Sequence, residues 1–203
     1  MESLRTTFDV LRKEVGKHIS LTDTEFAQTT SFFAPRRLRK GQYLLQEGEV
    51  SKHMAFVSAG FLRSYTVDEK GDEHVDQFAF EGWWISDPYS FLTGKPGIYF
   101  IDALEDSDLL LIEHDAYENL CATVPKFEHY FRVLLENHLV ATHKRLLSTI
   151  SLPAEQRYLE LLQSCPNIPA RVALRNIASY LGITPEALSR IRGRLSKKHS
   201  QRP

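Results

Sequence analysis

The sequence predicts an α+β protein in which an antiparallel β-barrel or jelly roll is followed by one long helix and a C-terminal helix-turn-helix. Three observations predict this class: short strand-like runs between residues 43 and 112, an uninterrupted helical stretch between Pro125 and Ile150, and a helix-turn-helix pattern over residues 175–195. The chain has 203 residues, of which 42% are apolar and 25% are charged. This composition is typical of a globular protein with a buried core, and it excludes a disordered, collagen-like or purely coiled-coil chain.

The first 33 residues are predicted to form short helices. Four apolar side chains recur there at helical spacing: Leu4, Phe8, Leu11 and Val15. The segment Leu21-Thr-Asp-Thr-Glu-Phe26 resembles the capped start of a further helix. The N-terminal residues contain no apolar stretch of signal-peptide length, and no later segment stays uncharged for the roughly 18 residues that a membrane helix needs. We therefore expect a cytoplasmic protein with no membrane partner.

From about Arg36 the pattern changes to that of short strands. Six strand-like runs follow one another at nearly even spacing: residues 43–45, 54–58, 61–67, 73–78, 99–104 and 109–112. Turn-forming segments such as Asp68-Glu-Lys-Gly71 and Gly94-Lys-Pro-Gly97 separate them. Because no long helix interrupts these strands, we expect an antiparallel barrel or jelly roll.

Helical spacing returns after about residue 115, and the stretch from Pro125 to Ile150 contains no further Gly or Pro. Positions on one face follow an alternating spacing of four and three residues: Phe127, Phe131, Leu134, His138 and Ala141. A helix of about 35 Å with this spacing is typical of a seam that packs on a partner helix. We therefore predict a homodimer joined through this helix. The alternative is that the stripe only covers the β-domain.

These patterns divide the chain into a β-domain (residues 1–121), a dimerisation helix (122–149) and a helix-turn-helix domain (150–203). The net charge of −1 is distributed unevenly over them. Residues 170–203 carry eight Arg and Lys against one acid, a net charge of +7, so residues 1–169 carry −8. A basic C-terminal segment on an acidic body indicates a polyanionic partner for that segment, or else a solvated basic tail.

The two cysteines, Cys121 and Cys165, lie far apart and outside any CxxC pattern. Their spacing predicts neither a disulfide framework nor a zinc or iron-sulfur site. The eight histidines are scattered along the chain, and no cofactor or metal site is predicted. We expect both thiols to be buried and unreactive.

A helix-turn-helix pattern in the basic segment favours a polyanionic partner over a solvated tail. Ala178 is small where the second helix must approach closely, and Gly182 lies where the turn requires a positive φ. Thr184 is a suitable N-cap and Pro185 suits the first helical position, so the second helix should begin there. Five apolar residues supply the core between the two helices: Ile177, Leu181, Ile183, Leu188 and Ile191.

The exposed side chains of the second helix are then of types that can read DNA bases. Arg190 can donate two hydrogen bonds to guanine, Glu186 can accept one from cytosine, and Ser189 can reach bases or phosphates. Cations nearby are predicted to contact DNA phosphates: Arg175, Arg192, Arg194, Lys197 and Lys198. The pair Glu186 and Arg190 could instead be an ordinary exposed helix pair. The matched turn constraints and the local charge together favour DNA binding.

Two glycine-turn segments in the β-domain carry a resemblance to a known family: Lys40-Gly-Gln-Tyr-Leu-Leu-Gln-Glu-Gly-Glu49 and Met54-Ala-Phe-Val-Ser-Ala-Gly-Phe-Leu-Arg63. With Glu186 and Ser189-Arg190-Ile191 in the second helix, they make the chain similar over nearly its whole length to the CRP/FNR (cyclic AMP receptor and fumarate-nitrate regulator) family of transcription factors. The resemblance implies a cyclic-nucleotide-binding-like β-roll for an effector, a dimerisation helix and a helix-turn-helix. It also implies double-stranded DNA and RNA polymerase as partners.

The effector cassette departs from the family's pattern. In the family's cyclic-nucleotide binders a Glu holds the ribose and an Arg neutralises the phosphate. Asp87 could stand in for the acid here, but the place of the arginine falls at Pro96, Gly97 and Ile98, and a buried phosphate without its cation is costly. The candidate effector pocket consists of Trp84, Asp87, Tyr89, Lys95 and Tyr99, with plain core packing as the alternative for its aromatic residues. We expect no control by cyclic AMP through the family's usual contacts, and the effector stays unidentified.

Two further departures bear on DNA recognition. Pro185 occupies a position where the family often has a base-contacting Arg, so the preferred DNA sequence should differ from that of the well-known member. The given sequence ends eight residues after Leu195, which is too soon for the β-hairpin wing that usually follows. Whether the protein activates or represses depends on where its sites lie and is not encoded in these patterns.

Two functions other than that of a DNA-binding regulator are compatible with parts of the sequence. In the first, His74, Asp76 and Glu81 would form the metal site of a cupin-like β-barrel enzyme. That family needs another His from the following motif, and none lies between His74 and His114. In the second, the β-roll would serve as a cyclic-nucleotide-responsive regulatory module for another protein. A module of that kind needs no basic reading helix, so we expect no enzyme and no module of this kind.

Overall fold

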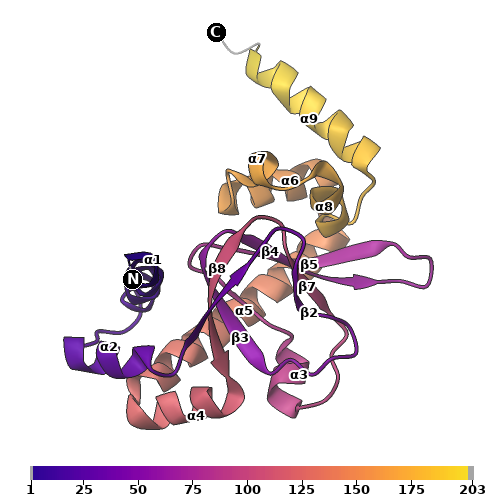
Figure 1. Ribbon diagram of the computed structural model, residues 1–203. Coiled ribbons are helices and arrows are strands. Elements are labelled where there is room, and N and C mark those ends of the chain that lie inside the picture. Colours follow the sequence, from indigo (N-terminus) through magenta and orange to yellow (C-terminus); the bar gives the residue numbers. More distant parts are fainter. Residues whose placement is uncertain (1, 201–203) are drawn as a thin grey trace. The chain divides into compact units, whose positions relative to one another are not determined.

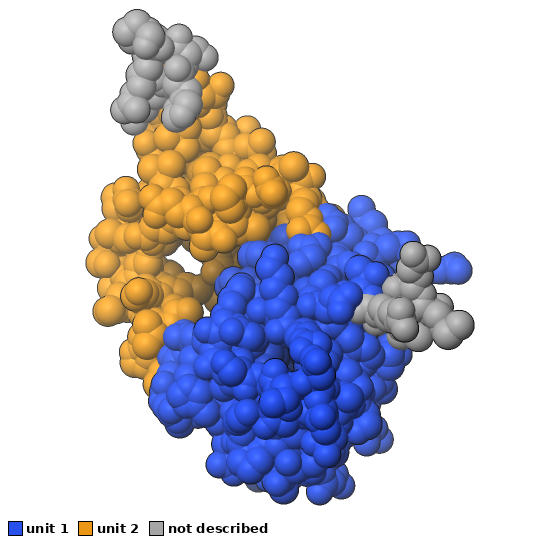
Figure 2. Space-filling view, turned by 90° about the vertical axis from the view of Figure 1, so that its left-hand side faces the viewer, with its two compact units in different colours: residues 1–66, 77–138 blue, residues 67–76, 139–203 orange. Residues whose placement is uncertain are grey.

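The structure, a computed structural model, describes the backbone of residues 2–200 and the side chains of residues 6–197 (Figure 1). Its contacts divide the chain into two compact units, residues 1–66 with 77–138 and residues 67–76 with 139–203 (Figure 2). The predicted division into three consecutive domains did not place residues 67–76 with the C-terminal residues. This grouping arises from contacts between residues that lie far apart in the sequence.

The order of elements confirms the predicted α+β class. The elements are α1 (Glu2–Val15), α2 (Asp23–Thr30), β1 (Ala34–Leu38), β2 (Tyr43–Leu45), β3 (His53–Ala59), β4 (Phe61–Val67), β5 (Glu73–Phe80), β6 (Trp84–Ile85), α3 (Pro88–Thr93), β7 (Phe100–Ala103), β8 (Ser107–Glu113), α4 (His114–Thr123), α5 (Lys126–Ser151), α6 (Ala154–Ser164), α7 (Ile168–Arg171), α8 (Leu174–Tyr180) and α9 (Pro185–Ser200). Among the described helices, none is both long enough and apolar enough to cross a membrane.

Helix α2 begins at a capping box, as its sequence predicted. The Thr22 hydroxyl accepts a hydrogen bond from the Glu25 N–H at 3.2 Å, and the Glu25 carboxylate accepts one from the Thr22 N–H at 2.8 Å. The Lys126 ammonium lies 2.8 Å from the same carboxylate. Its hydrogen bond, with those from Thr22, lowers the pKa of Glu25 to about 2. These contacts fasten α2 to the first turn of α5.

The strands form two antiparallel four-stranded sheets, in the orders β1-β8-β3-β6 and β2-β7-β4-β5. In the first sheet Ala55 pairs with Leu111, and in the second Leu62 pairs with Ala103. These four residues belong to one buried cluster, so the two sheets face each other across an apolar core. The predicted jelly-roll architecture is therefore confirmed.

Three elements of this unit were not predicted: β1, β6 and α3. Strand β1 has the sequence APRRL, in which four of five side chains are exposed, so it shows no apolar alternation. Strand β6 is only two residues long. Helix α3 has six residues and depends on a capping contact of Asp87 that is described below.

A second apolar core covers the outer face of the first sheet. Phe56, Leu110 and Ile112 from that face pack with residues of α1, α4 and α5. Within this core the Trp84 Nε1–H donates a hydrogen bond of 3.0 Å to the Tyr130 hydroxyl of α5. Burial raises the pKa of Tyr130 well above its usual value, so the hydroxyl stays neutral and can accept this bond.

The predicted burial of both cysteines is confirmed. Cys121 lies in the core that covers the first sheet. Its burial raises the pKa of the thiol to about 11, so the reactive thiolate is scarce at neutral pH.

Substitution of Tyr130 by Phe should lower the free energy of unfolding by about 1–3 kcal/mol, because it leaves the half-buried Trp84 N–H without its acceptor. Chemical denaturation followed by tryptophan fluorescence measures this change. Tyr89→Phe is the matched control, since Tyr89 is 56% exposed, and it should change stability little. Equal effects of the two substitutions would show that the Trp84–Tyr130 bond contributes nothing.

Candidate nucleic-acid interface and effector pocket

The helix-turn-helix is built from α8, a tight turn and α9, all within the second unit (Figure 1). Gly182 in the turn has a φ of 64°, a conformation that is costly for residues with a Cβ. Ala178 is fully buried. Of the five apolar residues predicted between the helices, four are buried and Ile183 is partly buried.

Helix α9 begins with Pro185, and the Thr184 hydroxyl accepts a hydrogen bond from the Ala187 N–H at 3.2 Å. The Glu186 carboxylate lies at the same helix N-terminus. Its own backbone N–H, the Thr184 hydroxyl and the charge of Arg190 all lower its pKa. Glu186 is therefore a carboxylate at neutral pH, able to accept hydrogen bonds but not to donate them.

The three predicted base-reading residues, Glu186, Ser189 and Arg190, are all exposed on α9. Most of the predicted phosphate contacts are exposed as well: Arg175 on α8 and Arg192, Arg194 and Lys197 on α9. The side chain of Lys198 lies outside the described ones. The described cations and the three predicted base-reading residues are therefore all exposed on the same pair of helices.

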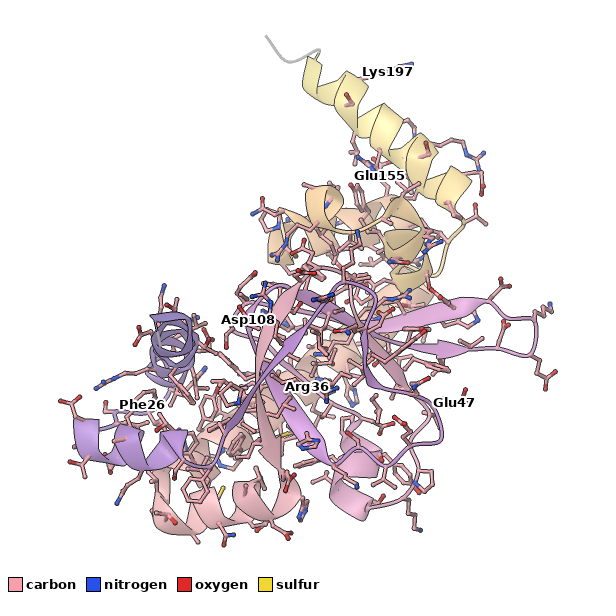
Figure 3. The ribbon with its side chains drawn as sticks, viewed as in Figure 1. Phe26, Arg36, Glu47, Asp108, Glu155 and Lys197 are labelled. Atoms are coloured by element: carbon pink, nitrogen blue, oxygen red, sulfur yellow. The ribbon has the colours of Figure 1, made fainter. Side chains whose placement is uncertain are left out.

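One face of α9 borders an open groove against the start of α6. The groove has a volume of about 590 Å³, and its charged lining residues are Arg190, Arg194 and Lys197. Figure 3 labels Lys197 on α9 and Glu155 on α6. The Glu155 carboxylate lies 3.4 Å from the Arg194 guanidinium, so this acid partly neutralises the positive charge at the groove.

Arg157 of α6 links the end of α5 to the end of α8, the first helix of the helix-turn-helix. The sequence did not indicate this role. The Arg157 guanidinium donates hydrogen bonds to the backbone carbonyls of Thr149 at 3.1 Å and Leu152 at 3.0 Å. A third bond, of 2.9 Å, goes to the carbonyl of Leu181, directly before the turn. These carbonyls lie at helix ends, where the backbone lacks partners within the helix. One side chain thus supplies donors to two helix ends.

The predicted effector-pocket residues do not converge on one cavity. Asp87 is fully buried, and its carboxylate caps α3 by accepting a hydrogen bond of 2.9 Å from the Ser90 N–H. Its second oxygen accepts a hydrogen bond of 3.1 Å from the Ile98 N–H in the segment after α3. Trp84 is directed into the core with Tyr130. Tyr89 and Lys95 are exposed, and Tyr99 is half-buried.

Gly97, one of the three residues at which the family's arginine was expected, lies against the Asp87 carboxylate. A Cβ on Gly97 would lie 2.3 Å from the Asp87 carboxylate, which is closer than the normal contact distance between two non-bonded atoms. The site therefore has room for neither a larger side chain at residue 97 nor a ligand oxygen between the two residues. What the sequence suggested as a ligand-binding acid is a helix cap.

A separate cavity of about 580 Å³ lies beside α3. Its lining comprises residues 50–52, 90–94 and 113–115, and none of the five predicted pocket residues is among these described positions. Lys52, Glu113, His114 and Asp115 give it charges of both signs. Phe91 and His114 lie with their rings 5.4 Å apart at its wall.

The residues proposed for a cupin-like metal site each have another partner. His74 Nε2 lies 2.9 Å from the Asp68 carboxylate, and the Asp76 carboxylate accepts a hydrogen bond from Arg145. Glu81 accepts one from the Gly60 N–H at 3.0 Å. Within the part of the chain that the structure describes, no group of three His, Cys, Asp or Glu could hold a metal ion.

Comparisons with known proteins agree with this architecture. The cyclic nucleotide-binding domain family matches residues 35–124. Regulatory protein HlyX of Actinobacillus pleuropneumoniae is 25% identical over 190 residues, covering 88% of this chain and 78% of the relative. The fumarate and nitrate reduction regulatory protein of Vibrio cholerae is 26% identical over 193 residues, covering 88% and 75%. Both relatives are named as regulatory proteins.

Solved structures share the fold. FixK2 from Bradyrhizobium japonicum has a TM-score of 0.71 at 18% identity, over 82% of this chain and 86% of its own. The catabolite activator protein of Thermus thermophilus has a TM-score of 0.55 at 20% identity, over 89% and 86%. Each match covers more than four fifths of both chains.

Substitution of Thr184 by Ala should lower the free energy of unfolding by about 0.5–2 kcal/mol, because α9 loses its N-cap. It should also raise the pKa of Glu186 toward its ordinary value of 4.5, since the carboxylate loses the hydroxyl donor. Because the folded pKa is depressed, the contribution of Glu186 to stability is present above pH 4.5 and is lost as the pH falls through the folded pKa. NMR titration of the Glu186 side chain measures the shift, with Ser189→Ala as the control that leaves it unchanged. An unchanged pKa in Thr184→Ala would contradict this account of the helix start.

Proposed function

The chain belongs to the CRP/FNR family of transcription regulators, and on that premise we propose that it binds double-stranded DNA as a homodimer, with α9 as the reading helix. The observation that carries the proposal is the exposure of polar side chains on α9: Glu186, Ser189 and Arg190 are exposed in its first two turns, and Arg192, Arg194 and Lys197 are exposed further along the same helix. The relatives that match over most of the chain are regulators. A helix-turn-helix places this part of its second helix in the major groove.

One group of side chains is proposed to contact the DNA bases and another group to contact the phosphates. Arg190 and Glu186 have the hydrogen-bonding patterns that distinguish guanine and cytosine edges. Arg175, Arg192, Arg194 and Lys197 would neutralise phosphates and supply the salt-dependent affinity. Lys198 is proposed for the same role.

The homodimer rests on apolar surface of α5 that a single chain leaves exposed. Six of its side chains are between 52% and 76% exposed: Leu135, Leu139, Val140, Leu146, Leu147 and Ile150. Phe127 and Phe131 of the predicted seam instead lie in the core that covers the first sheet, and Leu134 packs against that core. The first part of the predicted stripe therefore covers the β-domain, and a second stripe remains for a partner helix. Large exposed apolar surfaces are characteristic of interfaces.

We further propose that cyclic AMP does not control the protein through the family's usual contacts. Asp87 is occupied as a helix cap, and Gly97 offers no cation for a phosphate. The cavity beside α3 is the proposed place for a small-molecule effector. Contact with RNA polymerase, and a place in the cytoplasm, are proposed from the family alone.

The wild-type protein should bind a twofold-symmetric DNA site whose half-sites lie about 10 to 11 base pairs apart, centre to centre. Arg190→Ala should lose about 1–3 kcal/mol of binding free energy at one base position. Lys197→Ala should weaken binding to all sequences alike and reduce the salt dependence. Fluorescence anisotropy on selected and random DNA at several salt concentrations measures both. Identical behaviour of the two variants would refute the division into base reader and phosphate contact.

Saturating cyclic AMP or cyclic GMP should leave the melting temperature unchanged. A ligand at 100 times its dissociation constant would stabilise the folded state by about 2.7 kcal/mol, which a thermal melt detects easily. Lys95→Ala provides the companion measurement, because Lys95 is the one Lys or Arg in the effector cassette, residues 84–99. A clear shift in the wild type that Lys95→Ala abolishes would contradict the proposal.

A further inference from the structure

The base of the β4–β5 hairpin contacts the helix-turn-helix directly, within the second unit. Arg145 of α5 donates hydrogen bonds to the Asp76 carbonyl, to the Asp76 carboxylate at 2.9 Å and to the Val75 carbonyl at 3.1 Å. The same guanidinium lies 4.4 Å from the centre of the Tyr180 ring at the end of α8. Arg145 thus joins three elements: the dimerisation helix, the hairpin and the first helix of the helix-turn-helix.

Ser179 of α8 makes the second connection. Its hydroxyl donates a hydrogen bond of 2.6 Å to the Glu73 carbonyl and accepts one of 2.9 Å from the Val75 N–H. Both of these partners are backbone groups of β5. The contact therefore requires the hydroxyl of Ser179 and is independent of the hairpin's own side chains.

Hydrogen bonds within its turn stabilise the β4–β5 hairpin. The Asp68 carboxylate accepts hydrogen bonds from the N–H groups of Lys70 at 2.9 Å and Asp72 at 3.0 Å, and Gly71 supplies the positive φ of the turn. The bond to His74 is the largest of the contacts that lower the pKa of Asp68. A hairpin ordered in this way can serve as a rigid support for α8.

We propose that Arg145 and Ser179 are positioning residues for DNA recognition: they hold α8, and with it α9, in one place on the C-terminal half of α5. The inference rests on the proposed function. Because residues 139–151 of α5 carry most of the proposed dimer seam, a fixed α8 would set the separation of the two reading helices. The contacts leave Arg175, Glu186 and Arg190 exposed. They therefore support the reading surface and do not cover it.

A fixed position of α8 and α9 would strengthen the binding of the dimer's second α9 to the second half-site. Once one α9 has bound its half-site, the effective concentration of the other depends on how well the linkage matches the distance to the second half-site. A rigid linkage of the right length favours one spacing strongly. A loose linkage binds several spacings, each more weakly.

Ser179→Ala removes both hydrogen bonds with the smallest change in volume. We expect it to weaken binding to the twofold site by about tenfold or more, to leave binding to a single half-site unchanged, and to reduce discrimination against sites lengthened or shortened by one base pair. Arg145→Lys keeps the positive charge but loses the several N–H donors of the guanidinium. It should also weaken binding to the twofold site and reduce discrimination between spacings. Ser179→Thr keeps the hydroxyl and should restore most of the spacing preference.

The control is Ser164→Ala on α6, since the Ser164 hydroxyl bonds only to carbonyls of its own helix among the contacts the structure describes. Circular dichroism and light scattering establish that each variant is folded and has the oligomeric state of the wild type. Unchanged or tighter binding of Ser179→Ala to the twofold site would overturn the proposal. So would an equal loss on the single half-site, which would indicate damage to the helix-turn-helix. A wild-type protein that discriminates no DNA sequence would instead refute the proposed function itself.

Discussion

Helix α5 has two apolar surfaces, and a single chain can bury only one of them. Phe127, Tyr130 and Phe131 near its start complete the core over the first sheet. Leu146, Leu147 and Ile150 near its end remain exposed. Because burial of apolar surface is the main favourable term in association, a second copy of α5 is the natural partner for this end. The proposed recognition of DNA by two chains depends on this constraint, because a partner helix on this surface would bring two copies of α9 to one site.

The C-terminal helices attach to this same end of α5 through two arginines. Arg157 supplies donors to the carbonyls of Thr149, Leu152 and Leu181. Arg145 reaches the hairpin backbone and the ring of Tyr180. Arginine suits both places because its planar guanidinium offers several donors in a fixed geometry. Most of the polar contacts are made with backbone groups.

What the sequence predicted well is local. The capping box of Thr22, the turn at Gly182 and the helix start at Thr184 each follow from a few neighbouring residues whose roles depend on backbone conformation. Asp87 shows the limit of such patterns. An acid followed by Pro can begin a helix or hold a ligand. In the structure both carboxylate oxygens of Asp87 accept backbone hydrogen bonds, one from the Ser90 N–H and one from the Ile98 N–H eleven residues along, and the second of these contacts has no local sequence signal.

The long-range contacts could not be predicted. Arg145 meets Asp76 across 69 residues of sequence, and Ser179 meets Glu73 across 106. No spacing or periodicity encodes such pairs, which is why residues 67–76 were expected to belong with the β-domain. The exposed apolar surface of α5 was predicted only in part, because the alternating stripe begins with residues that the β-domain buries.

The central claim is that two chains act together on one DNA site. The most direct test is the mass of the protein–DNA complex, measured by light scattering on a duplex that carries one twofold-symmetric site. The account predicts two chains of 23.3 kDa each per duplex, and the same two-chain mass for the protein alone at micromolar concentration. A protein that stays at 23.3 kDa in solution and binds the site as a single chain would contradict it.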